Sequence, residues 1–250
     1  MSVHSKWKTI QHKKGAADAK RGKIFSKLGK EITIAAKAGG GNPDMNPSLR
    51  TLVAKARANN MPADNIDRAI KKGTGELEGG SQLEEITYEG YIGGGIAVIV
   101  KVLTDNKNRA AAEVRHVFTK FGTSFAAQGA VSRNFKRRGQ ILVEAGGIDE
   151  DKLMSIVLDA GAEDMTEDAG VFEIITEPAA FTKVEEALQA AEIKTVSSEL
   201  TMLPDTYMSI TDKTAAANAM RFIETLEGLE DVQDVYSNMD VDDAILKELG

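Results

Sequence analysis

Residues 20–38, KRGKIFSKLGKEITIAAKA, predict the first structural element. Apolar residues at positions 24, 25, 28, 32 and 35 recur at the spacing of one face of an α-helix. Lysines at positions 20, 23, 27, 30 and 37 fall roughly opposite that face. We therefore expect a helix that buries one side in a core and presents a row of ammonium groups on the other.

Two more helices are expected downstream. Residues 47–59 carry an apolar face, and residues 62–73 begin with Pro62, which suits a first helical turn. Gly73 is expected to end the third helix as a left-handed cap. The glycine-rich stretch 73–81, GTGELEGGS, has the composition of a linker. These patterns predict a helical N-terminal domain over residues 1–78.

The rest of the chain alternates strand and helix patterns. Strands are expected near 84–91 and 96–103, around a glycine hairpin, with a helix over 109–121. From 139 to 204 the expected order is β-α-β-β-α-β, which is typical of a ferredoxin-like unit. A last helix over 213–226 and a strand near 232–236 can complete the first of these sheets.

The predicted fold class is therefore α+β and multidomain. A three-helix N-terminal domain is followed by two α/β, ferredoxin-like domains, one inserted in the other. The predicted boundaries are 1–78, then 79–138 plus 205–250, with 139–204 as the inserted domain.

Charge is distributed unevenly along the chain. Residues 1–75 contain 16 Lys and Arg against 5 Asp and Glu, whereas residues 141–250 contain 6 against 26, in a chain of net charge -7. Such asymmetry indicates a basic domain that binds a polyanion, joined to an acidic body that does not. A purely solvated basic surface is the alternative.

The candidate contacts with a polyanion lie mostly near the N-terminus. Lysines are point charges that contact phosphates without reading sequence. Trp7 is the only tryptophan of the chain, and it is expected either to stack on an exposed base or to hold the N-terminal arm on the helical domain. The candidate residues here are His4, Ser5, Lys6, Trp7, Lys8, His12, Lys13, Lys14, Lys20, Arg21, Lys23, Lys27, Lys30, Lys71 and Lys72.

A second candidate patch follows the second strand pattern. It consists of Asn106, Lys107, Arg109, Arg115 and His116, although positions 109 and 115 do not share one helical face well. No cluster of Arg, Asn and Gln that would read base edges is evident on one helical face. Backbone and shape recognition is therefore favoured over base readout.

Several classes of chemistry find no support in the sequence. The chain has no cysteine, and its three histidines lack the spacing of a helical metal site. Neither a phosphate-binding loop nor a nucleophile elbow is present, and the longest apolar run, residues 96–100, is far too short to span a bilayer. We expect no enzyme activity, cofactor, metal, small-molecule substrate or membrane contact, and a cytoplasmic location.

Long motifs in the first third carry a family resemblance. HSKW at residues 4–7, HKKGAADAKRGK at 12–23 and NMPADNIDRAIKKGTGE at 60–76 closely resemble the YebC family, and NKNR at 106–109 and EVRH at 113–116 extend the match. The resemblance implies three domains and a cytoplasmic protein without known enzyme activity. It also implies a DNA-binding regulator of transcription or, from members linked to translation, a ribosome-associated factor that relieves stalls at proline-rich stretches.

Three hypotheses follow for function. The first is a non-enzymatic nucleic-acid-binding regulator of gene expression, with either DNA or ribosomal RNA as its partner. The second is a protein-interaction scaffold that uses the acidic body, and the third is an undetected enzyme. The sequence does not decide between DNA and RNA, and it leaves the oligomeric state open.

Overall fold

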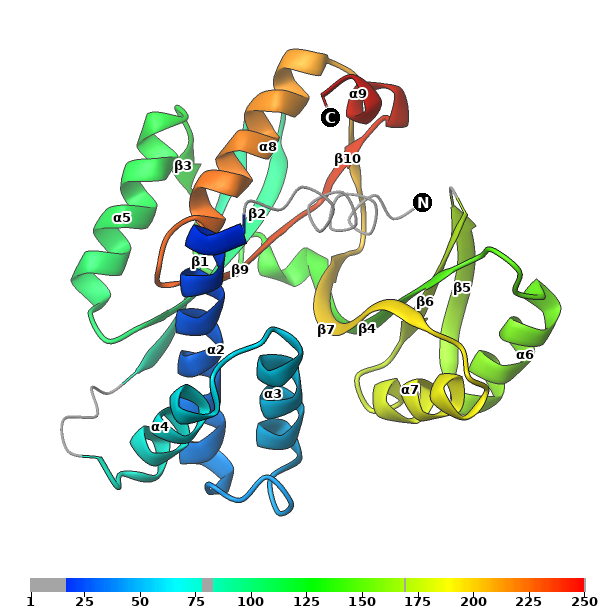
Figure 1. Ribbon diagram of the computed structural model, residues 1–250. Helices are drawn as coiled ribbons and strands as arrows, with labels where there is room; N and C mark the ends of the chain where they lie inside the picture. Colours follow the sequence, from blue (N-terminus) through cyan, green and yellow to red (C-terminus); the bar gives the residue numbers. More distant parts are fainter. Residues whose placement is uncertain (1–16, 78–82, 169, 250) are drawn as a thin grey trace.

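The computed structural model describes residues 17–77, 83–168 and 170–249. These residues form three groups of elements, each with a hydrophobic core of its own (Figure 1). Among the described helices, none combines the length and apolar character needed to cross a membrane. The α+β class expected from the sequence is confirmed.

Three helices make up the first group: α2 (Ala17–Gly39), α3 (Pro47–Ala58) and α4 (Ala63–Thr74). They lie where the sequence predicts them, and their apolar faces meet around the buried side chains of Ile32 and Leu49. Asn46 joins two of the helices. Its Oδ1 accepts the N–H of Leu49 at 3.1 Å, capping α3, while its Nδ2 donates to the carbonyl of Ala35 in α2 at 2.8 Å.

Gly73 does not end α4, and the prediction of a cap there was wrong. The helix continues to Thr74, and Gly75 takes the left-handed cap with φ of 79°. A Cβ on Gly73 would lie 2.3 Å from the carbonyl oxygen of Thr33 and 2.7 Å from the Cβ of Ala36, both in α2. Gly73 is therefore needed for the close approach of the two helices.

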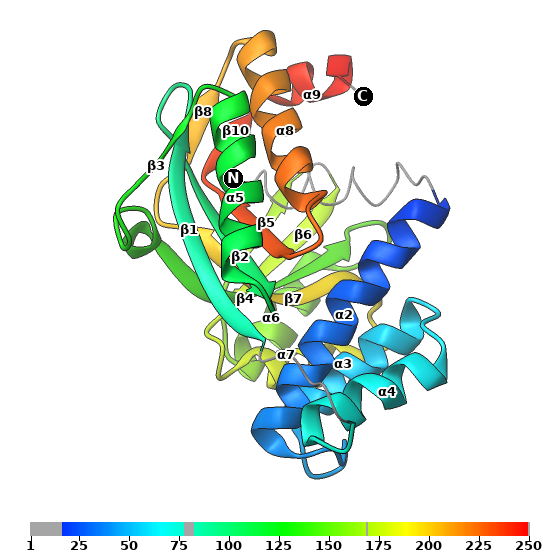
Figure 2. The same ribbon diagram turned by 90° about the vertical axis from the view of Figure 1, so that its left-hand side faces the viewer.

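The second group is built on an antiparallel sheet of order β3-β1-β2-β9. Its strands are β1 (Glu84–Ile92), β2 (Ile96–Thr104), β3 (Ser124–Phe125) and β9 (Val232–Ser237). Helices α5 (Lys107–Lys120) and α8 (Lys213–Glu227) pack together on one face of this sheet (Figure 2). Because β9 comes from the C-terminal part of the chain, the sheet joins segments more than 100 residues apart.

The third group has the ferredoxin-like order of elements. It runs β4 (Phe135–Glu144), α6 (Glu150–Ala160), β5 (Ala162–Asp168), β6 (Val171–Thr176), α7 (Phe181–Ala190) and β7 (Thr195–Pro204). The antiparallel sheet has the order β5-β6-β4-β7, and the two helices cover one face around the buried Ile141, Leu153 and Val184.

Several short elements of the structure were not predicted from the sequence. These are β3, the parallel pair β8 (Met208–Ile210) and β10 (Met239–Val241), helix α9 (Asp243–Leu249) and a 3₁₀ turn over Ser132–Asn134. Strands of two or three residues are too short to show an alternating pattern. Strand β4 also begins at Phe135, earlier than predicted, because its charged residues 136–138 pair with β7.

The second and third groups meet at a smaller apolar cluster. Ile99 and Tyr236, on the face of the first sheet away from α5 and α8, pack with Val131 and Phe135. Nearby, the buried carboxylate of Glu89 accepts backbone N–H groups of residues 129, 131 and 132 at 2.9, 2.6 and 2.9 Å. We propose that the three cores mark three domains with the boundaries predicted above.

Candidate nucleic-acid interface

The side chains of half of the predicted contact residues lie outside the part of the chain that the structure describes. His4, Ser5, Lys6, Trp7, Lys8, His12, Lys13 and Lys14 precede the described residues, and Lys20 and Arg21 belong to the first turns of α2. Their role in nucleic-acid binding stays a prediction.

Lys23 and Lys27 point from α2 to the turn that connects α8 to β9. The Nζ of Lys23 donates to the carbonyl of Gly228 at 2.7 Å, and the Nζ of Lys27 donates to those of Glu227 and Gln233 at 3.2 and 3.4 Å. Gly228 is the C-cap of α8, where the negative end of the helix dipole favours cations. Both ammonium groups thus hold the helical domain against the second domain.

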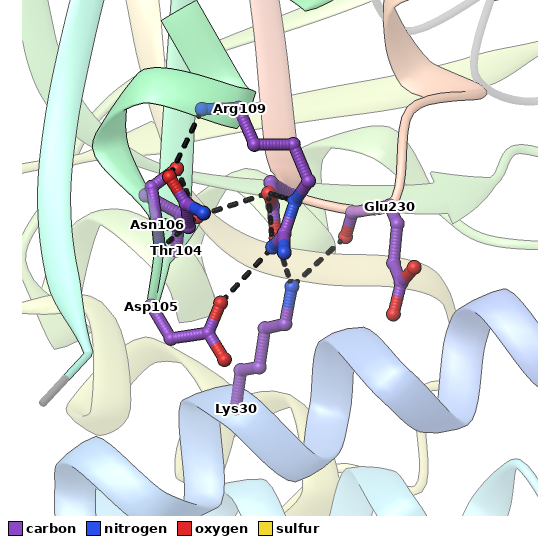
Figure 3. Close-up of polar contacts among 7 residues, drawn as sticks. Lys30, Thr104, Asp105, Asn106, Arg109 and Glu230 are labelled. Carbon is purple, nitrogen blue, oxygen red and sulfur yellow. Dashed lines mark hydrogen bonds and ion pairs between the residues drawn. The ribbon is translucent and has the colours of Figure 1, made fainter. Parts of the chain in front are cut away.

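Lys30 completes this contact through Asp231. Its Nζ donates to Oδ1 of Asp231 at 2.7 Å and to the carbonyl of Glu230 at 3.2 Å (Figure 3). The other carboxylate oxygen, Oδ2, accepts from Arg109 Nη2 at 2.8 Å and from Thr104 Oγ1 at 2.9 Å. We call Lys23, Lys27 and Lys30 together with residues 227–233 and Arg109 the interdomain clamp.

Burial shapes the electrostatics of the clamp. Burial by itself would raise the pKa of Asp231, but the hydrogen bonds from Lys30, Arg109 and Thr104 outweigh it, so that its pKa lies below the ordinary value. Burial lowers the pKa of Lys27, and nearby acids only partly oppose this. The clamp is therefore a partly desolvated ionic contact, in which an unpaired charge would be costly.

The residues of the second predicted patch do not form one site, and several of them have contacts within the protein. Asn106 caps α5, its Oδ1 accepting the N–H of Arg109 at 3.0 Å. Lys107 pairs with Glu84 at 2.5 Å on the surface. The guanidinium of Arg115 lies 5.9 Å from the ring centre of Phe125, and His116 is exposed on the same helix. The structure does not bring Arg115 and His116 to the clamp.

Other cations of the helical domain face solvent. Arg50 and Arg57 on α3, and Arg68 and Lys71 on α4, are exposed, and within the described residues their side chains make no hydrogen bond or ion pair. We call these four the outward cations. Of these four, only Lys71 is among the contact residues predicted from the sequence; the polar faces of the second and third helix patterns could have indicated the arginines.

A cavity of about 330 Å³ lies at the junction of the two domains. Its walls come from α2, α4 and the turn of the clamp, and they include Ser26, Lys30, Asn65, Arg68, Lys72 and Glu230. Phe25, Met61 and Leu83 add apolar surface. Asn65 and Arg68 lie on one face of α4, and a pair of this size does not stand out in the sequence as a cluster of polar residues.

Comparison with known proteins shows where the chain belongs. A family model described as the TACO1/YebC protein N-terminal domain matches residues 5–76, and one described as the TACO1/YebC second and third domain matches residues 83–239. The chain belongs to the TACO1/YebC family. The resemblance found in the sequence is thereby confirmed.

Relatives of the TACO1/YebC chain match over nearly their full length. A "Probable transcriptional regulatory protein" of Desulfatibacillum aliphaticivorans is 56% identical over 98% of this chain and 99% of its own. A protein of the same name from Treponema pallidum (strain Nichols) is 53% identical over 96% of this chain and 98% of its own. The crystal structure of a conserved hypothetical protein, Aq1575, from Aquifex aeolicus superposes with a TM-score of 0.81 at 44% identity, covering 92% of this chain and 95% of that one.

Several family-motif residues serve the clamp in this TACO1/YebC chain. The motif NKNR supplies both the α5 cap, Asn106, and the partner of Asp231, Arg109. Lys23 ends the motif HKKGAADAKRGK, and it contacts Gly228. Within the described residues, no group of three His, Cys, Asp or Glu side chains is placed to hold a metal ion.

Proposed function

We propose that this protein is a non-enzymatic regulator of gene expression that binds the phosphate backbone of nucleic acid through its helical N-terminal domain. The main observation behind this proposal is the uneven distribution of charge. Residues 1–75 contain 16 Lys and Arg against 5 Asp and Glu, whereas residues 141–250 contain 6 Lys and Arg against 26 Asp and Glu. The names of the family relatives, probable transcriptional regulatory proteins, support the regulatory role.

The exposed side chains of the helical domain support phosphate contacts. The outward cations are open to solvent, so that a polyanion can approach them without displacing an internal partner. Lys71 belongs to the predicted contact set, and the lysines of residues 4–14 would extend it. Each phosphate that such a cation neutralises releases counterions and makes binding sensitive to salt.

The acidic residues 141–250 are expected to orient the molecule on its nucleic-acid partner. Residues 141–250 carry 20 more acids than bases, and a polyanion repels such a surface. We expect the helical domain to face the nucleic acid while the ferredoxin-like domain points away from it. That domain is then left to contact other components.

A second candidate is a translation factor that binds ribosomal RNA. The observation in its favour is the excess of lysine over base-reading residues near the N-terminus. Lysine contacts suit recognition of backbone and shape, which is how proteins recognise helical RNA. DNA and ribosomal RNA therefore have to be compared directly.

The test measures binding of the full chain to purified ribosomes and to duplex DNA over a salt series around 150 mM. A Lys13→Glu/Lys14→Glu variant removes charge from the basic end, and a Lys152→Glu/Lys183→Glu variant makes the same change of net charge in the acidic body. We expect the first variant to lose binding and the second to keep it. Equal loss in both variants, or binding that is indifferent to salt, would refute the proposal.

The preferred partner is decided in the same experiment. Ribosome binding that survives 150 mM salt while DNA binding collapses selects translation. A single promoter fragment that is held far more tightly than scrambled DNA selects transcription. A protein partner that binds equally well to the basic-end variant, with no nucleic-acid binding, selects the scaffold hypothesis.

A further inference from the structure

The cavity between α2, α4 and the clamp combines phosphate-binding groups with an apolar floor. We propose that it receives one unpaired nucleotide of the bound nucleic-acid strand, with the phosphate on Arg68 and the base against Phe25 and Met61. The inference rests on the proposed function and names a site for it.

The cationic wall comes from one face of α4. Asn65, Arg68 and Lys72 are spaced by three and four residues, so that their side chains lie along the same side of the helix. Arg68 has five N–H donors in a planar fork, and within the described residues none has a partner. A phosphate group fits this fork with two parallel hydrogen bonds.

Lys30 faces the cavity from α2 with its position already fixed. Its ammonium group has three donors, of which Asp231 and Glu230 take two. With 18% of its side chain exposed, Lys30 is held by the clamp and does not move freely. One donor is thus left for a ligand, and the side chain loses little conformational freedom when it binds.

The apolar part of the cavity suits a base. Phe25 is half-buried and Met61 is buried, and both line the cavity. Gly29 of α2 also lines the cavity without a side chain, and a Cβ there would come 3.9 Å from the Cε of Met61. Rings and thioethers pack well against the flat face of a base. An inorganic anion would leave this surface exposed to water, which favours a nucleotide as the ligand.

The size of the cavity limits what can enter. A volume of about 330 Å³ lies at the lower end of small-molecule sites, roughly 300–1,000 Å³. This space matches one nucleotide better than a base pair. We therefore expect the nucleotide to be unpaired, as in a single strand or a loop whose bases are splayed out.

The first experiment compares two arginines that carry the same charge. The affinity of the full chain for a ten-nucleotide single-stranded RNA is measured at 150 mM salt for wild type, Arg68→Ala and the control Arg50→Ala. Both variants lose one cation of the helical domain, but only Arg68 lines the cavity. We expect Arg68→Ala to weaken binding about tenfold, as for the loss of a charged hydrogen-bond pair, and Arg50→Ala less than about threefold.

A second variant blocks the cavity without changing charge. Ser26 is exposed on α2 at the cavity wall, so that Ser26→Phe fills the space and leaves the core intact. It should weaken binding of the single strand as much as Arg68→Ala does. Photo-crosslinking of a 4-thiouridine strand should place the base on the peptides that contain Phe25 or Met61.

The outcomes separate this inference from the proposed function. Equal effects of Arg68→Ala and Arg50→Ala, or crosslinks that map away from the cavity, overturn the nucleotide site while the binding function survives. Failure of the wild-type chain to bind any nucleic acid at this salt overturns the function, and the site with it. Urea unfolding of each variant, expected to match wild type, confirms that lost binding is not lost folding.

Discussion

Two sets of cations in the helical domain differ in what they contact. Lys23, Lys27 and Lys30 on α2 donate to oxygens of the second domain, about 200 residues later in the chain. The outward cations on α3 and α4, such as Arg57 and Lys71, face solvent. Both sets add positive charge to the domain, but the clamp lysines are engaged within the molecule, whereas the outward cations have no partner among the described residues.

This difference shows what a count of charges can and cannot establish. The excess of positive charge predicts a polyanion-binding domain, but the count of charges does not say which of the two sets would contact the polyanion. Which ammonium groups are available depends on the turn between α8 and β9, which supplies carbonyl oxygens at a helix C-terminus and the buried carboxylate of Asp231. We therefore propose that Lys23 and Lys27 position the two domains, that Lys30 does so while also facing the cavity, and that the outward cations contact phosphate.

The largest effect is expected from removing the centre of the clamp. Asp231→Ala leaves Lys30 and Arg109 without their shared carboxylate, which is 2% exposed. We expect a loss of roughly 3 kcal/mol in the free energy of unfolding, measured by urea denaturation. Asp105→Ala is the matched control, because Asp105 also binds Arg109 but at the surface. A similar loss in both variants would mean that Asp231 does not centre the clamp.

The position of the outward cations on α4 depends on Gly73. Gly73→Ala places a Cβ against the carbonyl of Thr33, and we expect it to lower the free energy of unfolding by about 2 kcal/mol through overpacking. Gly22→Ala is the control, since a Cβ there has nothing within 4 Å and should stabilise α2 by about 0.5–1 kcal/mol. An unchanged free energy of unfolding in Gly73→Ala would show that α2 and α4 can move apart without cost.

Acid is expected to weaken the clamp before it affects the outward cations. The folded-state pKa of Asp231 is lowered, so its contribution to stability is complete above the unfolded value of about 4 and is lost as pH falls through the folded pKa. Burial raises the pKa of Glu31, which has the opposite sign and offsets part of the loss. Stability measured between pH 6 and pH 3 should fall less in Asp231→Asn than in wild type. An equal loss of stability between pH 6 and pH 3 in the variant and in wild type would contradict this expectation.

The smallest effect is expected at the exposed pair of Lys107 and Glu84. Their side chains are 58% and 45% exposed, and such pairs contribute little because water and salt screen them. Glu84→Gln should change the free energy of unfolding by less than about 0.5 kcal/mol in urea titrations. A change as large as that of Asp231→Ala would show that exposure does not separate these two ion pairs.

The fold was predictable where elements are long and periodic. The stripe through Leu28 and Ile32 and the β-α-β-β-α-β order are local signals, and the structure contains both. The cap at Gly73 could not be placed correctly, because the reason for that glycine is Thr33 on another helix. Short strands such as β8 and β10 depend on pairing rather than on their own sequence.

The candidate site was predictable in its chemistry but not in its geometry. The motif of Asn106 and Arg109 pointed to a polar site, yet its contacts are a helix cap and an ion pair with Asp231. No local pattern reveals an acceptor more than 100 residues away. The cavity with Arg68 likewise arises only when α2, α4 and the clamp turn come together.

The salt dependence of nucleic-acid binding tests the division between the two cation sets most directly. The slope of log K against log salt would be measured for single-stranded RNA with Arg57→Gln/Lys71→Gln and with Lys23→Gln/Lys27→Gln, two clamp lysines that do not line the cavity. Each lost phosphate contact should reduce the slope by about 0.7, so that the outward pair lowers it by about 1.4 and the clamp pair leaves it unchanged. A reduced slope in the clamp variant alone would contradict the account.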